Sequence, residues 1–337
     1  MTGKTFQHHS VLLLGTCFVL VSILAAGCVF VSTKGLLSRG PQPLEETVLF
    51  GKGKEKILLM EIEGLISEKK SSKPFQLQVE PSMVSSVKEQ LDMAAADERV
   101  RGILLMINSP GGTVTASDII YSEIRRFKEE KQVKVVALLH GTATSGGYYV
   151  ALGADRIIAY PTTVTGSIGV VLLNLNLDGL MEKIGVSNAT VKSGMYKDLG
   201  SPFRKPEKGE KEILQGVVDE LHGRFVRVVG DNRRGLNLSD HPEWLDGRIF
   251  TARQALSDGL IDQIGYVADA VDWVRGAAAA PDARVVRYKR RGDYLPNIYS
   301  YGKEQDIQAE FNLIKLDLEG LLSGGGPTFM YLWMPGL

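Results

Sequence analysis

The segment from Lys56 to Leu173 alternates apolar runs with amphipathic helical patterns, and this alternation restricts the possible fold more than any other feature. Residues 83–95 and 116–127 carry apolar side chains at helical spacing, whereas the runs around them are apolar throughout. Those runs are residues 57–62, 101–107, 135–139, 156–160 and 167–173. Strands that are apolar on both faces are typical of a parallel sheet whose two faces are both covered by helices. The sequence therefore predicts an α/β fold with a parallel sheet covered by helices.

The pattern becomes mainly helical after residue 205. Residues 213–228 form a long amphipathic pattern, and shorter helices are predicted at 252–257 and 268–275. Residues 284–290 are expected to form an edge strand, because their Arg and Lys side chains suit a solvated edge. We therefore place one domain at residues 55–290.

Residues 291–337 follow this domain as a C-terminal extension with little pattern. The extension ends in the apolar and aromatic segment 329–333. An exposed aromatic segment is costly to leave in water, so we expect it to pack on a neighbouring subunit or on a membrane surface.

The N-terminal part contains a segment without charge at residues 11–31, which would measure about 31 Å as a helix and could cross the hydrocarbon layer. We expect a transmembrane helix there, preceded by a short tail at 1–10 and followed by a linker at 32–54. The residues before Cys28 also resemble a lipobox, so an uncleaved anchor, a lipoprotein and a cleaved signal segment all stay open. The flanking charges do not fix the orientation.

Composition excludes several classes of function. Lys plus Arg equals Asp plus Glu at 39 each, so no basic excess points to nucleic acid. Both cysteines, Cys17 and Cys28, lie in the apolar N-terminal segment, which excludes disulfides and a cysteine nucleophile from the rest of the chain. The five histidines lack the spacing of a helical metal site. We expect neither a metal nor a cofactor.

Two glycine-rich turns follow two of the predicted strands, at residues 109–112 and 144–147. In a parallel sheet both turns lie at the carboxyl edge, where backbone N–H groups at a helix start can stabilise an anion. Neither turn has the spacing of a phosphate-binding loop. Together they place the hydroxyl of Ser145 beside two candidate oxyanion donors, the N–H groups of Gly112 and Gly146.

A serine nucleophile needs a base. His140 lies five residues before Ser145 at a predicted strand end, where its side chain is expected to pack or cap. The alternative is a lysine, and Lys197 lies in a segment of turn residues. A lysine that acts as a base near neutral pH needs a pKa lowered from about 10.4, which an apolar pocket would provide. A hydroxyl such as that of Ser167 could orient the neutral amine.

At these positions the sequence resembles the signal peptide peptidase SppA family. The motifs that carry the resemblance are INSPGG at 107–112, ATSGGYY at 143–149, TGSIGV at 165–170, SGMYKD at 193–198 with Ser201-Pro202, DGRIFT at 246–251, QAL at 254–256 and GLID at 259–262. The resemblance covers roughly residues 55–290, and the order of the motifs makes it stronger than any single motif would.

The resemblance implies a membrane-anchored serine endopeptidase with a Clp protease/crotonase-like fold. It assigns Ser145 as nucleophile, Lys197 as general base, Gly112 and Gly146 as oxyanion donors, and Ser167 as the residue that positions the lysine. It also implies a ring-shaped homo-oligomer in which serine and lysine come from adjacent protomers. The expected substrates are released signal peptides, at the bacterial inner membrane, with a single-pass anchor and the catalytic domain outside the cytoplasm.

Two other functions fit parts of the same pattern. A crotonase-like acyl-CoA enzyme would share the sheet and the paired N–H donors but would use no serine nucleophile. A catalytically inactive membrane scaffold would bind peptides or proteins without cutting them.

Overall fold

Four of the five apolar runs of the sequence form strands of one sheet in the computed structural model, which describes residues 43–69, 81–233, 235–290 and 328–335. The fifth run, 167–173, was predicted as one strand but contains only a short strand at its end, Val171–Leu173, which belongs to a second sheet. Within the described residues the first sheet has nine strands, and six are parallel neighbours in the order β11-β2-β3-β5-β6-β10. The nine strands are β1 (Leu44–Phe50), β2 (Lys56–Glu63), β3 (Val100–Ser109), β5 (Lys134–Thr144), β6 (Arg156–Ala159), β7 (Val164–Gly166), β9 (Ile249–Thr251), β10 (Gln263–Ile264) and β11 (Arg284–Arg290). The predicted α/β class with a parallel-rich sheet is confirmed.

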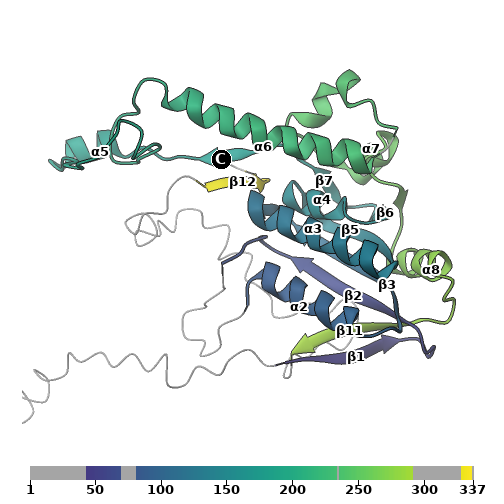
Figure 1. Cartoon of the computed structure of the whole chain (residues 1–337). Helices are drawn as coiled ribbons and strands as arrows, with labels where there is room; N and C mark the ends of the chain where they lie inside the picture. The colour runs from purple at the N-terminus through teal and green to yellow at the C-terminus, as the bar shows by residue number, and fades with distance from the viewer. Residues whose placement is uncertain (1–42, 70–80, 234, 291–327, 336–337) are drawn as a thin grey trace, which may run out of the picture. The chain divides into compact units, whose positions relative to one another are not determined.

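Helices cover both faces of this sheet because its strands are apolar on both sides (Figure 1). In β2, Leu58 and Met60 join the core formed with α2, α3, α4 and α6, whereas Ile57 and Leu59 join the core formed with α8. The helices are α2 (Met83–Ala95), α3 (Val114–Lys131), α4 (Gly146–Ala151), α5 (Asp178–Lys183), α6 (Glu210–Asn232), α7 (Ala252–Ser257) and α8 (Val267–Ala277), with short 3-10 turns at Leu238–Asp240 and Pro242–Leu245.

A second, small sheet lies where β3 and β5 end. Its order is β4-β12-β8, with β4 at Gly111–Thr113, β8 at Val171–Leu173 and β12 at Thr328–Leu332. Both neighbours of β12 are antiparallel to it. The C-terminal strand therefore fills the position between two short strands that are more than 50 residues apart in the sequence.

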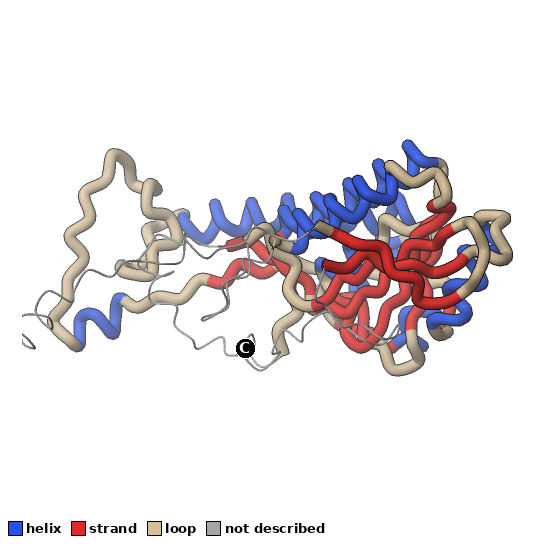
Figure 2. The backbone as a smooth tube through the Cα atoms, turned by 90° about the horizontal axis from the view of Figure 1, so that it is seen from below, coloured by secondary structure: helices blue, strands red, loops and turns tan. Residues whose placement is uncertain are grey.

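The segment between β8 and α6, residues 174–209, is called the arm here. It contains α5, and Figure 2 shows its loops and this short helix extending away from the strands of the sheet. Most of its side chains are exposed, and Gly200 is the one buried residue that it contains. Its fold is held by its own polar contacts, such as Leu177 N–H to Pro202 O at 2.7 Å.

Two predictions about the sheet need correction. Residues 44–50, predicted as part of a linker, form β1, which pairs antiparallel with β11. Residues 284–290, predicted as an edge strand, lie between β1 and β2 instead. The charges of β11 are compatible with this interior place because Arg287, which is 3% exposed, donates to Glu61 at 2.8 Å.

The aromatic end of the chain is covered in part by the chain itself. Tyr331 of β12 is fully buried and stacks on Tyr149 of α4. The other side chains of the segment 329–333 are half-buried, and their packing on a neighbouring subunit or a membrane surface stays a prediction.

The predicted anchor, residues 11–31, lies outside the described residues. None of the helices within the described ranges is both long enough and apolar enough to span a bilayer.

Glu61 should make the stability of the fold depend on pH. Burial raises the pKa of this carboxyl from 4.5 to about 7, although the neighbouring Arg287 lowers it. Between these values the folded chain holds a proton that the unfolded chain has lost, so the free energy of unfolding should fall as the pH rises from 4.5 to 7. At about 1.4 kcal/mol per pKa unit, the change approaches roughly 3 kcal/mol. Urea unfolding of the wild type and Glu61→Gln at pH 4.5 and 7 tests this, because equal pH slopes would contradict it.

Candidate active site

Ser145 lies in a strained turn between β5 and α4. Its φ is 51° and its ψ is −115°, a conformation that costs energy for a residue with a side chain. The turn is held by the Ser145 N–H, which donates to Gly166 O at 2.7 Å. The residue is 1% exposed, and its hydroxyl has no hydrogen-bond partner among the described residues. A buried, strained and unpartnered hydroxyl at a sheet edge is a candidate nucleophile.

The turn before Ser145 is prepared by an irregularity in β5. Ile107 pairs with Leu139 and Ser109 pairs with Ala143, so β5 contains extra residues at this point. Asn108 compensates by accepting from Thr142 N–H at 3.1 Å and donating to the Glu63 carboxylate at 2.9 Å. Such bulges bend a strand and redirect the residues that follow it.

The other glycine turn approaches Ser145 closely. Gly111 has a φ of 106°, and a Cβ added to it would lie 1.9 Å from the carbonyl oxygen of Tyr331 and 2.8 Å from the nitrogen of Gly146. A Cβ on Gly112 would lie 1.9 Å from Ile66 O. Both positions therefore require glycine, and the carbonyl of Tyr331 lies where the two predicted donor turns meet.

The backbone of β12 runs along β4 as an extended peptide would. Tyr331 is paired with Gly112, and Trp333 N–H donates to Pro110 O at 2.9 Å. This bond makes Trp333 and Pro110 a hydrogen-bonded pair. Hydrogen-bonded and non-hydrogen-bonded pairs alternate along antiparallel strands, so Tyr331 and Gly112, two residues away, also form a hydrogen-bonded pair. The Gly112 N–H is thus directed at the Tyr331 carbonyl, as an oxyanion donor would be.

The side chain of Tyr331 fills an aromatic pocket. Its ring stacks on Tyr149 at 5.1 Å between centroids and lies 4.8 Å from the ring of Phe225, while its hydroxyl donates to Leu221 O at 2.8 Å. Burial in this pocket raises the pKa of Tyr331. Residues of α4 and α6 line the pocket. Their rings and the Leu221 carbonyl suit a large ring with a hydroxyl at its far end.

The wall formed by Tyr149 is itself fixed. The Tyr149 hydroxyl donates to Asp118 at 2.6 Å, and Arg224 donates to the same carboxylate. Burial raises the pKa of Tyr149, and the hydrogen bond to Asp118 raises it further. The phenol therefore stays neutral and acts as a donor, which orients the ring against which Tyr331 stacks.

Ser167 directly follows the residue whose backbone is hydrogen-bonded to Ser145. It has a φ of 52°, is 6% exposed and donates its N–H to Arg248 O at 2.7 Å. Its neighbour Gly166 accepts from the Ser145 N–H. The structure thus brings Ser145, Gly112, Gly146 and Ser167 to one edge of the sheet.

Lys197 is not brought to this cluster within the chain. It is an exposed residue of the arm, and its backbone N–H donates to Gly194 O at 3.1 Å. Next to it, hydrogen bonds from Arg204 and then Lys192 hold the pKa of the Asp198 carboxyl well below its usual range. The arm therefore has an ordered local structure that presents Lys197 to solvent in the described chain.

Three contributors to the site escaped prediction. Gly111, Tyr149 and Tyr331 lie in or near motifs that were noted for other residues, and their roles depend on contacts between distant segments. For Gly111 a signal existed, because it precedes Gly112 in the same turn. The two tyrosines have no such signal, since a buried aromatic residue is ordinarily part of a core.

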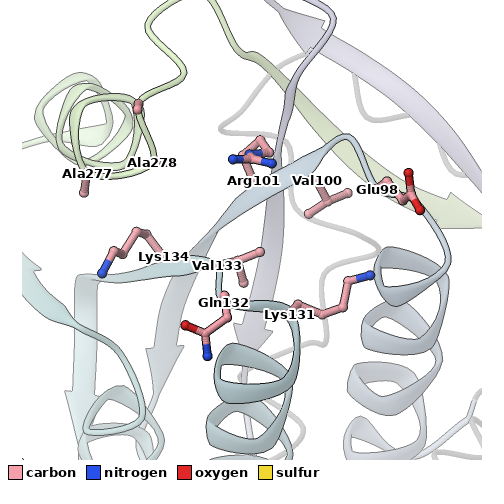
Figure 3. Close-up of a pocket in the computed structure, with 10 residues that line it drawn as sticks. Glu98, Val100, Arg101, Lys131, Gln132, Val133, Lys134, Ala277 and Ala278 are labelled. Atoms are coloured by element: carbon pink, nitrogen blue, oxygen red, sulfur yellow. The ribbon is translucent and has the colours of Figure 1, made fainter.

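No group of three His, Cys, Asp or Glu residues able to hold a metal ion occurs in the described part of the chain. A pocket of about 410 Å³ lies elsewhere, at the amino ends of β3 and β5 (Figure 3). Arg101, Lys131 and Lys134 line it. Because it lies at the sheet edge opposite Ser145, it is separate from the candidate active site.

The comparison with known proteins agrees with this arrangement. Residues 127–280 match the model of peptidase family S49, and the chain is 39% identical over 245 residues to a protein of Enterococcus faecium named as a signal peptide peptidase SppA. That alignment covers 73% of this chain and 70% of the relative. The chain belongs to peptidase family S49. The S49 match includes Ser145 and Lys197, and residues 72–179 also match the NfeD1b N-terminal domain.

Other similar proteins are matched over different shares of their own length. The chain is 31% identical over 252 residues to the chloroplastic serine protease SPPA of Arabidopsis thaliana, which is 74% of this chain and 36% of that protein. The solved structure of a membrane-bound stomatin-specific protease covers 66% of this chain and 85% of its own, with a TM-score of 0.42 and 16% identity. That similarity is too loose to assign a fold, so the Clp protease/crotonase-like fold stays a prediction.

Gly111→Ala should remove peptide turnover. The new Cβ would occupy the place of the Tyr331 carbonyl oxygen, and alanine is strained at a φ of 106°. We expect a loss of about 100-fold or more in peptide cleavage, the scale of a lost oxyanion contact. The control is Gly216→Ala on α6, where a Cβ meets no atom within 4 Å. That change should keep activity and stabilise the helix by up to about 1 kcal/mol. Equal activity of both variants would contradict the assignment.

Proposed function

We propose that the protein is a serine endopeptidase that binds an extended peptide between β4 and β8 and cleaves it at Ser145. One observation carries this proposal: β12 occupies that position, with the carbonyl oxygen of Tyr331 between the turns of Gly111 and Gly146. Adding a strand to an open sheet edge is a general way of binding peptides of differing sequence. The bond after Tyr331 marks the position of the scissile bond.

In this mechanism the Ser145 oxygen attacks the carbonyl carbon while the N–H groups of Gly112 and Gly146 stabilise the negative oxygen that forms. The neutral amine of Lys197 accepts the Ser145 proton and later passes it to the leaving amine. Ser167, beside the turn, holds that amine in place. An acyl-enzyme forms first, and water then hydrolyses it.

The base comes from an adjacent protomer in a ring-shaped homo-oligomer. This is supported by the Ser145 hydroxyl, which has no partner among the described residues, and by Lys197, which is exposed on the arm. The arm also carries exposed apolar side chains that would be buried against a second copy. They are Leu175, Leu180, Ile184, Val186, Val191, Met195 and Tyr196.

The substrates are released signal peptides, and the site is held at the bacterial inner membrane by residues 11–31 with the catalytic domain outside the cytoplasm. The uncharged N-terminal segment and the name of the Enterococcus faecium relative support this. The aromatic pocket around Tyr149 and Phe225 further suits an apolar peptide that offers a large residue before the cleaved bond.

Mixing two inactive variants tests the shared dyad. Ser145→Ala and Lys197→Ala should each abolish cleavage of a signal-peptide fragment without loss of folding. Co-refolded or co-expressed subunits should regain activity, up to about a quarter of the interfaces in a randomly mixed ring. Activity that stays at zero would overturn the sharing between protomers.

A fluorophosphonate probe separates the proposal from its alternatives. Labelling at Ser145, read by mass spectrometry, requires an activated serine. A folded oligomer that binds peptide but is neither labelled nor active would instead be a scaffold. Turnover of an acyl-CoA by Ser145→Ala would indicate the crotonase-like enzyme.

Removing β12 should raise activity on added peptide. Because β12 occupies the proposed peptide position, it competes with substrate, and a chain that ends at residue 327 should show a lower KM for a fluorogenic peptide with tyrosine before the cleaved bond. The second variant is full-length Tyr331→Gly, which keeps the strand but empties the aromatic pocket. A KM that both changes leave unaltered would contradict the assignment of this position to substrate.

A further inference from the structure

The oxyanion turn is anchored by a buried side chain for which the mechanism above has no role. Ser109 is fully buried at the end of β3. Its hydroxyl donates to Gly64 O at 2.6 Å and accepts from Gly111 N–H at 3.1 Å. One side chain thus joins the segment that follows β2 to the turn that carries Gly112.

A second set of contacts completes this anchor. Ile66 N–H donates to Gly111 O at 2.9 Å, and Thr113 N–H donates to Ile66 O at 2.9 Å. Ile66 also pairs with Gly112 on the side opposite β12. Both polar groups of the Gly111 backbone are therefore used to hold the turn, which leaves the other edge of Gly112 for a peptide.

Ser109 also touches the half of the site that carries the nucleophile. A Cβ on Gly147, two residues after Ser145, would lie 2.8 Å from Ser109 O. The start of α4 thus packs directly on Ser109. Ser109 is thus one residue that contacts both the turn of the Gly112 donor and the helix that follows Ser145.

We propose that Ser109 is a positioning residue that holds the Gly111–Gly112 turn in the orientation that stabilises the oxyanion. The proposal rests on the peptidase function argued above. Two adjacent glycines have the widest conformational freedom of any dipeptide, so their peptide groups can reorient unless they are held from outside. Alanine at position 109 would leave the buried Gly111 N–H and the partly buried Gly64 C=O without the hydroxyl that serves both.

Kinetics of the full-length Ser109→Ala variant test this role. We expect kcat to fall by about 10- to 100-fold with KM within about twofold, because the lost orientation matters in the transition state. Affinity for a peptide boronic acid, which forms a tetrahedral adduct with serine, should fall in parallel. Binding of the uncleaved peptide, measured in a Ser145→Ala background, should not change. Ser109→Thr keeps the hydroxyl and should restore part of kcat.

The control is Thr163→Ala, which removes another buried hydroxyl that donates to a backbone oxygen, Leu139 O at 2.8 Å. A folded Ser109→Ala variant with the kcat of Thr163→Ala would overturn the proposal. Amide hydrogen exchange at Gly111 gives a readout that needs no activity: it should be faster in Ser109→Ala than in Thr163→Ala. If the wild type proves inactive, the peptidase assignment fails, and equal exchange rates would separately refute the role of Ser109.

Discussion

The backbone of Ser145 is held in a conformation that its own side chain disfavours, and the rest of the site is arranged around that turn. A positive φ at a non-glycine residue persists only where surrounding contacts determine it. Here the Gly166 carbonyl holds the Ser145 N–H, and the bulge anchored by Asn108 directs β5 into the turn. The strain turns the hydroxyl out of the strand and opens a helix whose first N–H belongs to Gly146. The proposed nucleophile and one proposed oxyanion donor therefore result from the same bend.

The close approach of backbones explains why glycine dominates the site. Gly111, Gly112 and Gly146 each have a backbone or side-chain atom within 3 Å of where a Cβ would lie. Such contacts let an incoming strand reach the N–H groups at hydrogen-bonding distance, and they leave no space for a side chain. The cost is conformational freedom, which the buried hydroxyl of Ser109 and the strand segment at Ile66 restrict. Rigidity of the site is thus supplied by neighbours rather than by the glycines themselves.

The limits of prediction from sequence follow from the distance over which each feature is determined. The long strands β2, β3 and β5, the long helices and the two glycine turns depend on local periodicity and turn chemistry, so they were predicted close to their observed bounds. The run 167–173 was predicted as one strand, but only Val171–Leu173 is a strand there, and it depends on pairing with the distant β12. The interior place of β11 was missed because its charged residues suggested solvent, whereas Arg287 has a carboxylate partner, Glu61, 226 residues away. The place of β12 depends on pairing with β4 and β8, and no local pattern encodes a register between such distant segments. The same holds for Tyr149. Its buried ring is predicted as an ordinary core residue, and only the contact with the distant Tyr331 shows that it lines the pocket.

In the function proposed here, recognition of a peptide through a strand edge also limits what the site can select. Main-chain hydrogen bonds along β4 and β8 are available to any extended segment, so they give affinity without distinguishing sequences. Selection then depends on the pocket for Tyr331, where two rings and the Leu221 carbonyl meet one side chain. A site built in this way accepts many peptides with one suitable residue, and the aromatic end of its own chain satisfies the same requirement. The position of β12 between β4 and β8 therefore follows from the same main-chain pairing and aromatic pocket that are proposed to bind the substrate.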